Sequence, residues 1–342
     1  MDKAAIAILN WNGLELLEKY LPSVVKNSQV SRVSIYVIDN GSTDDSVSFI
    51  NSHFPEVKII CLNKNYGFAD GYNKGLMQIE AEYFVLLNSD VEVTDGWISP
   101  LISILDTSSD IGACQPKIKS YVNKDQFEYA GAAGGYIDKY GFPFCRGRLF
   151  NIFETDNGQY EKTENIFWAS GACLFIRSKI YFEIGGLDAE FFAHMEEIDL
   201  CWRMLSRGYR VLYQPSSVVY HLGGATLNKT NPHKTFLNFR NNLYLLYKNM
   251  PKGKVGKLLF VRMVLDGIAA LKFLIGFEFR NFYAVFHAHM KFYFTMHKFK
   301  DKRIENLKSM KIFDHSTIYK KSIVADFFFR KKKYFSELHF KP

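Results

Sequence analysis

The chain has 342 residues, 48% of them apolar, which suits one large domain with an appendage or two domains and excludes a wholly disordered protein. Its formal net charge of +8 is unevenly divided: residues 240–342 contain 22 Lys and Arg against 7 Asp and Glu, and residues 1–239 contain 21 against 28. An acidic body with a basic tail predicts a polyanionic partner, such as an anionic membrane or a nucleic acid.

Five scattered cysteines without a Cys-x-x-Cys pair indicate reduced thiols in a cytosolic compartment and argue against a structural zinc site. The N-terminal apolar run, residues 4–9, is too short for a signal-peptide core and predicts a first strand. We therefore expect the protein to stay on the side of the membrane where it is made.

Short apolar strands alternate with helical patterns through the first half of the chain. The predicted strands are residues 4–9, 33–38, 57–61 and 83–87, and the predicted helices are residues 14–26, a segment after residue 44, and residues 68–79. This alternation predicts βαβ units and a mostly parallel sheet with right-handed crossovers. Polar loops follow three of the strands, at residues 10–13, 39–44 and 88–90, and should gather at the sheet edge where such folds bind ligands.

The pattern is weaker from residue 115 to 165, where we expect short strands and a mobile loop, before a strand within residues 168–177 that is entered through a tight glycine turn. An apolar stripe then predicts a helix that ends at Gly208; the stripe is Ile198, Cys201, Trp202 and Leu205. Asp199 and Arg203 are four residues apart and can pair along this helix. Residues 210–213 and 218–220 follow as two strands.

The strand at residues 83–87 is apolar throughout, which predicts cover on both faces, and it ends on Asn88-Ser89-Asp90. Asp90 is a candidate ligand for Mg²⁺ or Mn²⁺, which favour oxygen ligands and take others from water and substrate phosphates. His221 ends a later strand and is a candidate second ligand or diphosphate contact. The alternatives are a simple turn for residues 88–90 and a half-buried structural histidine for His221.

Two further clusters of polar residues are candidates for ligand binding or acid–base catalysis. The loop from Asp39 to Asp44 suits hydrogen bonding to a nucleobase or ribose, and its alternative is a helix cap alone. Glu196 and Glu197 fall in the first turn of the predicted helix, where the helix dipole by itself favours acidic residues. Mutual repulsion and partial desolvation would also make one of these carboxylates a better general base.

Seven stretches together carry a family resemblance. They are Asn10-Trp-Asn-Gly13, Val37-Ile-Asp-Asn-Gly-Ser-Thr-Asp-Asp-Ser46, Asn65-Tyr-Gly-Phe-Ala-Asp-Gly-Tyr-Asn-Lys-Gly75, Leu86-Leu-Asn-Ser-Asp90, Trp168-Ala-Ser-Gly-Ala172, Glu196-Glu-Ile-Asp-Leu-Cys-Trp-Arg203 and His221-Leu-Gly-Gly224. In this order and spacing, over residues 4–248, the chain resembles family 2 inverting glycosyltransferases of the GT-A fold, particularly bacterial rhamnosyltransferase-like members that build cell-surface polysaccharides.

The resemblance implies a role for each matching residue. Asp39 would contact the donor base or ribose, Asp70 would lie beside the nucleotide or sugar, and Asp90 would bind the metal that bridges the donor diphosphate. Glu197 would be the catalytic base, with Glu196 as the second choice. The full implied set is Asn10, Trp11, Asp39, Asn40, Asp70, Asn88, Ser89 and Asp90 for the donor, Trp168, Gly171 and Arg203 for the acceptor or diphosphate, and Asp90 with His221 for a Mg²⁺ or Mn²⁺ ion.

Two positions depart from the family pattern. Glu197 stands where the family often has an aspartate, and Asn88 replaces the first aspartate of the more familiar Asp-x-Asp form, as in many rhamnosyltransferase-like members. The metal site must therefore depend on Asp90, His221 and the donor diphosphate.

The resemblance implies an α/β fold of the GT-A type, with a mixed, mostly parallel sheet flanked by helices and a C-terminal helical, basic and aromatic appendage. We expect a catalytic domain over residues 1–239 and a membrane-associated region over residues 240–342. The implied activity is inverting transfer of a sugar, with dTDP-rhamnose as the favoured donor, to a lipid-linked or cell-surface glycan. The alternatives are a nucleotidylyltransferase, for which the chain lacks a Gly-rich, lysine-bearing N-terminal loop, and a non-catalytic nucleotide- or membrane-binding protein.

The basic tail contains an apolar segment, residues 258–279, that is interrupted by Arg262, Asp266 and Lys272. On a helical wheel these three side chains form a polar stripe on an apolar cylinder, which suits an interfacial helix better than a spanning one. Aromatic residues from 282 to 299 and basic clusters at residues 298–303 and 330–333 favour a cytoplasmic, peripheral position on the inner face of the plasma membrane. The alternative is a helical subdomain packed on the catalytic body, and no recognition motif supports nucleic-acid binding.

Overall fold

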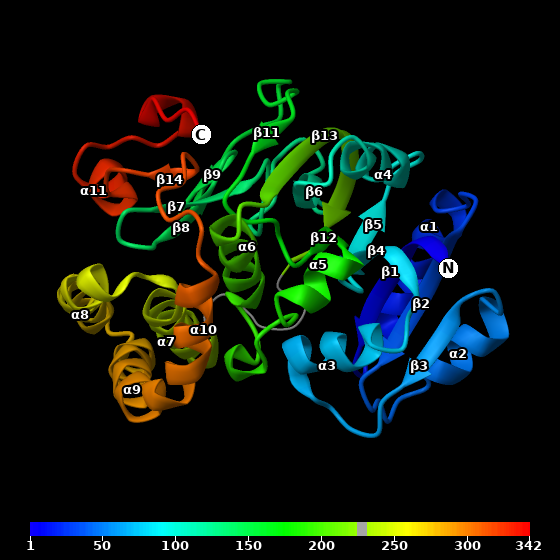
Figure 1. The fold of residues 1–342 in the computed structure, drawn as a ribbon, viewed down its shortest axis with the longest axis horizontal. Coiled ribbons are helices and arrows are strands. Elements are labelled where there is room, and N and C mark those ends of the chain that lie inside the picture. Colours follow the sequence, from blue (N-terminus) through cyan, green and yellow to red (C-terminus); the bar gives the residue numbers. More distant parts are fainter. Residues whose placement is uncertain (224–230) are drawn as a thin grey trace.

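The computed structural model describes residues 1–223 and 231–342, and within them a nine-stranded mixed sheet forms the centre of the molecule (Figure 1). The strand order is β11-β13-β6-β12-β4-β1-β2-β3, with β5 paired to β13. The strands are β1 (Asp2–Asn10), β2 (Val33–Asp39), β3 (Lys58–Cys61), β4 (Ala81–Leu87), β5 (Val91–Val93), β6 (Ile111–Ser120), β11 (Glu164–Asn165), β12 (Cys173–Arg177) and β13 (Arg210–His221).

Helices cover both faces of this sheet. They are α1 (Leu14–Asn27), α2 (Ser46–His53), α3 (Gly67–Leu76), α4 (Ile98–Asp106), α5 (Ser178–Glu183) and α6 (Glu196–Ser206). Buried side chains of α1, α2 and α4 belong to one apolar cluster, and those of α3, α5 and α6 belong to the other. Strands β3, β2, β1 and β4 lie side by side in that order, and each adjacent pair among these four strands is parallel. This arrangement confirms the predicted βαβ units.

Strand β4 lies at the middle of the sheet, between β1 and β12. Its side chains alternate between the two apolar clusters: Tyr83 and Val85 pack on one face, while Phe84 and Leu86 pack on the other. The prediction of a strand covered on both faces is confirmed, and the polar residues that follow it are held at the sheet edge.

One strand prediction is wrong. Residues 210–213 and 218–220 were expected as separate strands, but both lie in the single strand β13, which pairs in parallel with β6. The register shifts between Gln214 and Val218, so the chain bulges there without leaving the sheet. The continuous strand brings its last residue, His221, to the same sheet edge as Val91 of β5.

A second, smaller sheet occupies much of the segment whose sequence pattern is weak. Its order is β10-β9-β8-β7-β14. The strands are β7 (Gly135–Asp138), β8 (Pro143–Cys145), β9 (Arg148–Leu149), β10 (Ile152–Phe153) and β14 (Ile318–Tyr319). Because β14 pairs in parallel with β7, the C-terminal region is joined to the catalytic body by backbone hydrogen bonds as well as by helix packing.

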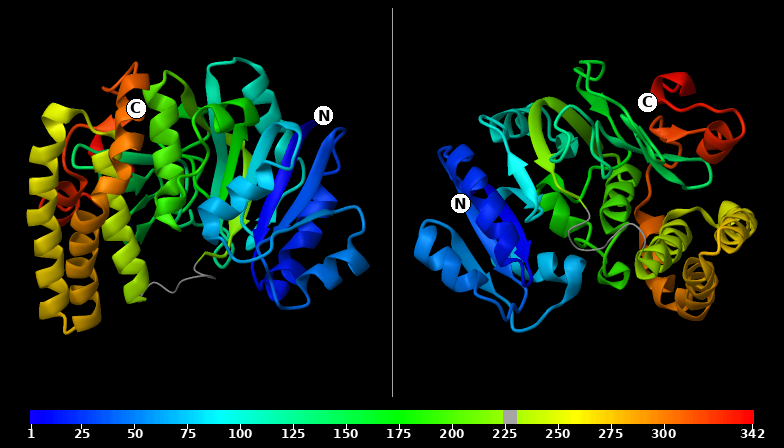
Figure 2. Two further views of the ribbon diagram at one scale, coloured as in Figure 1. Left: turned by 60° about the horizontal axis from the view of Figure 1, so that its bottom comes forward. Right: turned by 180° about the vertical axis from the view of Figure 1, so that it is seen from behind.

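The C-terminal region is mainly helical. Its helices are α7 (Pro232–Asn249), α8 (Lys252–Ile275), α9 (Phe279–Thr295), α10 (Lys300–Ser309) and α11 (Ile323–Phe328). The predicted domain boundary after residue 239 falls inside α7. Figure 2 shows α8 and α9 as an antiparallel hairpin at the edge of the molecule, with α7 between this hairpin and the sheet domain. Within the described part of the chain, no helix is both long and apolar enough to cross a membrane.

Two members of the predicted polar stripe of α8, Arg262 and Asp266, face the protein and not water, which corrects the expected interfacial orientation, whereas Lys272 is exposed. Arg262 donates to Asp266 and to the carbonyl of Tyr140, at 3.0 and 3.3 Å, and His289 of α9 lies 3.1 Å from the same Asp266 carboxylate. A fourth polar partner, Asn242 of α7, accepts from Arg262. Buried charges need partners, and these partners lie on the body side of the helix.

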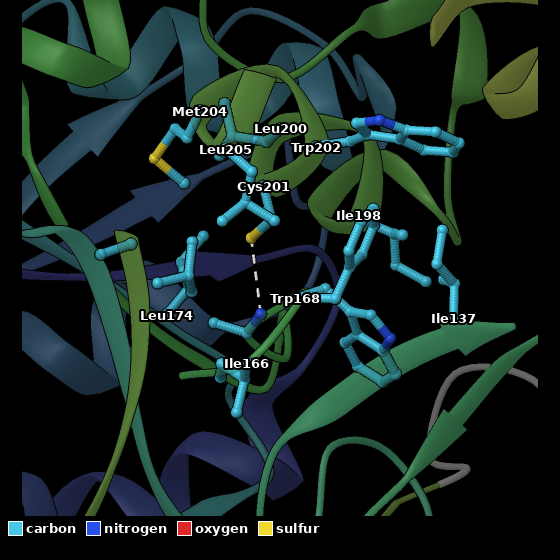
Figure 3. Close-up of a cluster of buried hydrophobic side chains, with 14 of the residues drawn as sticks. Ile137, Ile166, Trp168, Leu174, Ile198, Leu200, Cys201, Trp202, Met204 and Leu205 are labelled. Atoms are coloured by element: carbon cyan, nitrogen blue, oxygen red, sulfur yellow. Dashed lines mark hydrogen bonds between the residues drawn. The ribbon is translucent and has the colours of Figure 1, made fainter. Parts of the chain in front are cut away.

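Helix α6 is anchored by the apolar stripe that the sequence predicts. Figure 3 shows Ile198, Cys201 and Leu205 within a buried cluster that also contains Trp168 and Ile137. The backbone N–H of Ala169 donates to the Cys201 thiol, at 3.4 Å. The four cysteines other than Cys61 are buried, and burial raises the pKa of the Cys201 thiol to about 12.

A buried ionic cluster joins α6 to α7. The ammonium group of Lys248 lies 2.6 Å from Asp188 and 2.7 Å from Asp199, and Arg203 donates to Asp199 at 2.8 Å. Burial opposes the charged form of Asp199, yet Lys248 and Arg203 outweigh it and lower the pKa of this carboxyl. The predicted Asp199–Arg203 pair is confirmed, with α7 as an additional partner.

We predict that Lys248→Met lowers the free energy of unfolding by about 3 kcal/mol, because it leaves two buried carboxylates without their shared cation. The matched control is Lys298→Met, which removes an exposed pair with Glu190 at 3.6 Å and should cost less than about 1 kcal/mol. Urea unfolding of both variants measures the difference. Equal free energies of unfolding for the two variants would contradict the predicted contribution of the ionic cluster to stability.

Candidate active site

Asp90 and His221 meet at the sheet edge, as the sequence predicts. The backbone N–H of Leu222 donates to the carbonyl of Asp90, and the Nε2 atom of His221 lies 3.1 Å from Oδ1 of Asp90. Both side chains are buried. Burial opposes ionisation of Asp90, but the neighbouring imidazole outweighs it and holds the pKa of this carboxyl below its usual value.

A third residue, Glu128, completes this cluster and was missed by sequence reasoning. Its Oε2 atom lies 3.3 Å from Nδ1 of His221. Burial works against a charged imidazole, but Glu128 and Asp90 prevail and raise the pKa of His221 to about 10. Glu128 lies in the segment without clear periodicity, so no local signal could have identified it.

The chemistry of Asp90 and His221 fits a divalent ion that receives two protein ligands. A carboxylate oxygen and an imidazole nitrogen both suit Mn²⁺, and Mg²⁺ is usually held by few protein groups plus phosphates and water. Among residues 1–223 and 231–342, no group of three or more His, Cys, Asp and Glu side chains forms a complete metal cage. The motif residue Gly224 lies outside the described residues.

The loops after β1 and β2 hold each other in place. Asn10 donates to Asp39 at 3.2 Å, and the other Asp39 oxygen accepts from the backbone N–H of Ser42 at 3.0 Å. The Oδ1 atom of Asn10 is buried without a hydrogen-bond partner. Trp11 stands beside this network with 54% of its surface exposed, so the loop offers both an aromatic surface and polar groups.

Asp44 has a wider capping role than the sequence predicts. Its carboxylate accepts from the N–H of Leu14 at 3.1 Å and from the N–H of Ser46 at 3.2 Å. It therefore ties the start of α1 to the start of α2. Burial opposes the charge of Asp44, but these hydrogen bonds lower the pKa of its carboxyl.

Asn40 and Asp70 organise the start of α3. Asn40 is buried, accepts from the N–H of Tyr66 at 3.0 Å and donates to the carbonyl of Gly67 at 3.0 Å. Asp70 is half-buried in the first turn and lies 3.8 Å from Lys74. These contacts give Asn40 a structural role and leave Asp70 partly accessible.

Glu196 and Glu197 begin α6, as predicted, but their surroundings differ. Glu196 is 4% exposed, whereas Glu197 is half-buried, and the Oε2 atom of each is buried without a hydrogen-bond partner. Burial and the neighbouring Glu197 raise the pKa of Glu196 well above its usual value. Burial raises the pKa of Glu197 to about 7, with backbone N–H groups acting in the opposite direction. Glu197 is therefore the less buried of the two carboxylates, and its raised pKa makes it a base near neutral pH.

The segment Ser170-Gly171-Ala172 links Glu197 to the Asp90 edge. The carbonyl of Ala172 accepts from the N–H of Asn88 at 3.0 Å. A Cβ atom placed on Gly171 would lie 3.9 Å from Glu197 and 3.7 Å from Phe68. Gly171 thus leaves space in front of the Glu197 side chain.

Two residues implied by the family resemblance make structural contacts instead of facing this space. Trp168 is buried, and its indole N–H donates to the carbonyl of Tyr136 at 3.0 Å. Arg203 is buried and donates to Asp199 and to the carbonyls of Ile184 and Gly186. Both side chains therefore have structural roles.

The loop before Glu196 is held by α7, a contact that sequence reasoning missed. Phe192, His194 and Met195 all have positive φ angles, which are costly for residues other than glycine. The amide of Asn241 donates to the carbonyls of residues 191, 193 and 194 at 2.8–3.0 Å. Asn is unfavourable inside helices, so the Asn241-Asn242 pair was the available signal.

A family model described as Glycosyl transferase family 2 matches residues 5–185, just over half of the chain. The chain belongs to glycosyl transferase family 2. A similar curated protein is the N-acetylglucosaminyl-diphospho-decaprenol L-rhamnosyltransferase of Mycobacterium tuberculosis, with 26% identity over 60% of this chain and 71% of the relative. Another is the low-salt glycan biosynthesis hexosyltransferase Agl10 of Haloferax volcanii, with 23% identity over 70% of this chain and 74% of the relative. The predicted family is confirmed.

Solved structures of glycosyltransferases share the fold. GalNAc-T7 with UDP, GalNAc and Mn²⁺ has 16% identity and a TM-score of 0.56, covering 72% of this chain and 48% of that one. The mannosyltransferase PcManGT from Pyrobaculum calidifontis, in complex with GDP-Man and Mn²⁺, has 12% identity and a TM-score of 0.50, covering 90% and 84%. The GT-A fold is thereby confirmed for this glycosyltransferase.

We predict that Gly171→Val lowers the rate of sugar transfer at least about 100-fold, because its branches would occupy the space in front of Glu197. Gly171→Ala is the matched control and should retain most activity, since a single Cβ makes ordinary contacts at 3.7–3.9 Å. Nucleotide binding, measured by calorimetry, should be unchanged in both variants. Equal activity of the two variants would place the reacting groups elsewhere.

Proposed function

We propose that this glycosyltransferase moves a sugar from a nucleoside diphosphate donor to a hydroxyl group of a lipid-linked or cell-surface glycan, with inversion at the anomeric carbon. The observation that carries the proposal is the link through residues 170–172 between a half-buried, weakly acidic Glu197 and the Asp90–His221 pair. This arrangement provides a base on one side of the segment and a diphosphate anchor on the other. The curated relatives favour a deoxyhexose or hexose, and we propose dTDP-rhamnose as the donor.

Each described residue of the site then has a defined task. Asp39 binds the base or ribose of the donor beside Trp11, and Asp70 lies near the nucleotide or sugar. Glu197 removes the proton from the acceptor hydroxyl as its oxygen attacks the anomeric carbon. A single displacement needs no covalent protein nucleophile and inverts the configuration.

Asp90 and His221 would hold a Mg²⁺ or Mn²⁺ ion against the donor diphosphate. When bound, such an ion supplies positive charge where the leaving diphosphate gains negative charge. Glu128 would orient the imidazole of His221 through the opposite ring nitrogen. We propose that the reaction takes place at the inner face of the plasma membrane, where a lipid-linked acceptor would be anchored.

The decisive experiment separates donor binding from transfer in two variants. Glu197→Gln should lower transfer by at least about 1000-fold, because the base is lost, while nucleotide diphosphates still raise the melting temperature in the presence of Mn²⁺. Asp90→Asn should abolish the Mn²⁺-dependent part of that stabilisation. Glu190→Gln, an exposed carboxylate outside the site, is the control for both. Absence of stabilisation by any nucleotide or nucleotide sugar in the unaltered protein would refute the proposed donor class.

We predict that the rate of transfer rises with pH up to about 7 and is constant above about pH 8. Glu197 accepts a proton only when ionised, and because its pKa is raised to about 7, its active form is lost as the pH falls below that value. The decline should approach tenfold per pH unit in the acid limb. Nucleotide affinity measured over the same range distinguishes this effect from changes in donor binding. A rate that is flat between pH 5 and 8 would exclude Glu197 as the base.

A further inference from the structure

The α8–α9 hairpin directs several large apolar side chains toward solvent, while Arg262 and Asp266 face the protein. A cluster around its turn is exposed over 37–81% of each side chain; we call it the apolar tip, and it consists of Leu271, Leu274, Ile275, Phe277, Phe279 and Tyr283. The rings of Phe277 and Phe279 lie 6.3 Å apart. Contiguous exposed apolar surface of this kind marks an interaction site.

Buried charges fix the orientation of this hairpin. Arg262 and Asp266 are 2% and 1% exposed, and His289 of α9 contacts the same carboxylate. Rotating α8 to bury its apolar side chains would expose or unpair these charged groups, which is unfavourable. The apolar tip is therefore a stable feature of the folded protein.

The charges around the apolar tip favour an anionic lipid surface as its partner. Residues 252–300 contain nine Lys and Arg against two Asp and Glu. Since Arg262 pairs with Asp266 and Lys298 pairs with Glu190, seven basic residues remain against Glu278 alone. Lys272 and Arg280 adjoin the apolar tip, four others lie further along the two helices, and one begins α10. A symmetric contact with a second copy would bring these like charges together, whereas anionic headgroups would attract them.

The apolar tip lies near the loop that precedes Glu196. Thr235, in the first turn of α7, donates to Asn281 at the start of α9, at 2.9 Å. Asn241, which holds the loop before Glu196, lies six residues further along α7, or about 9 Å of helix rise. Figure 2 (left) shows the α8–α9 turn and the start of α7 at the same lower end of the molecule.

We propose that the apolar tip inserts into the interfacial region of an anionic bilayer and sets the proposed active site at the membrane surface. The exposed aromatic and aliphatic side chains enter the boundary between headgroups and acyl chains, and the flanking basic residues, among them Lys272 and Arg280, bind the anionic headgroups. This inference rests on the proposed transfer to a lipid-linked acceptor and specifies the surface that brings enzyme and acceptor together.

Vesicle flotation with the full-length protein tests the proposal. The protein should float with phosphatidylcholine vesicles that contain phosphatidylglycerol, and much less with vesicles that lack it or at high salt. The double variant Ile275→Ser/Phe277→Ser should bind at least about tenfold more weakly. Its matched control is Met77→Ser/Val122→Ser, which alters two apolar residues of similar exposure outside the hairpin, and this variant should bind as the unaltered protein does.

Four measurements decide the outcome. Equal flotation of the tip variant and its control would overturn the proposal, as would a dimer in light scattering that only the tip variant dissociates. Melting temperatures within a few degrees of the unaltered protein establish that both variants fold. Nucleotide stabilisation is measured in parallel: its persistence without vesicle binding would refute only the lipid surface, and its absence with vesicle binding intact would refute only the proposed donor chemistry.

Discussion

The structure depends on one buried cation, the ammonium group of Lys248, which lies between Asp188 and Asp199. Asp199 belongs to α6, the helix that begins with Glu196 and the proposed base Glu197, and Asp188 precedes the loop that leads into it. Lys248 belongs to α7. Because all three charged groups are removed from water, their separation would be costly, and the catalytic helix is thereby tied to the C-terminal region.

This coupling makes the C-terminal helices part of the catalytic unit. Helix α7 supplies both Lys248 and Asn241, so one helix neutralises the carboxylates behind the site and holds the strained loop in front of it. The same helix packs against the α8–α9 hairpin through Thr235 and Asn281. A contact between the hairpin and a membrane would therefore orient the proposed active site through directly packed helices.

Much of the site could be predicted because its residues lie at the ends of regular elements. Asp39, Asp90 and His221 each fall at or just after the end of a strand, and the carboxyl ends of parallel strands share one edge. Glu196 and Glu197 could be placed because the apolar stripe of α6 defines where the helix starts. Glu128 could not be found, since it reaches His221 from a segment with no periodic pattern. The family resemblance implied a site role for Arg203, and its contacts with the carbonyls of Ile184 and Gly186, which have no sequence signature, showed its structural role only in the folded protein.

The sequence by itself determined the alternation of strands and helices, the polar loops that end the strands and the position of the paired glutamates, because these follow from local periodicity and from the chemistry of strand ends and helix starts. The tertiary structure alone decided that Glu197 is less buried than Glu196, and that Arg262 and Asp266 of α8 face inward. Burial and pairing depend on groups far apart in the chain: Asp266 meets a histidine 23 residues away, and Lys248 meets a carboxylate 60 residues away. A helical wheel shows which side chains share a face, but only the packed neighbours determine which face meets water.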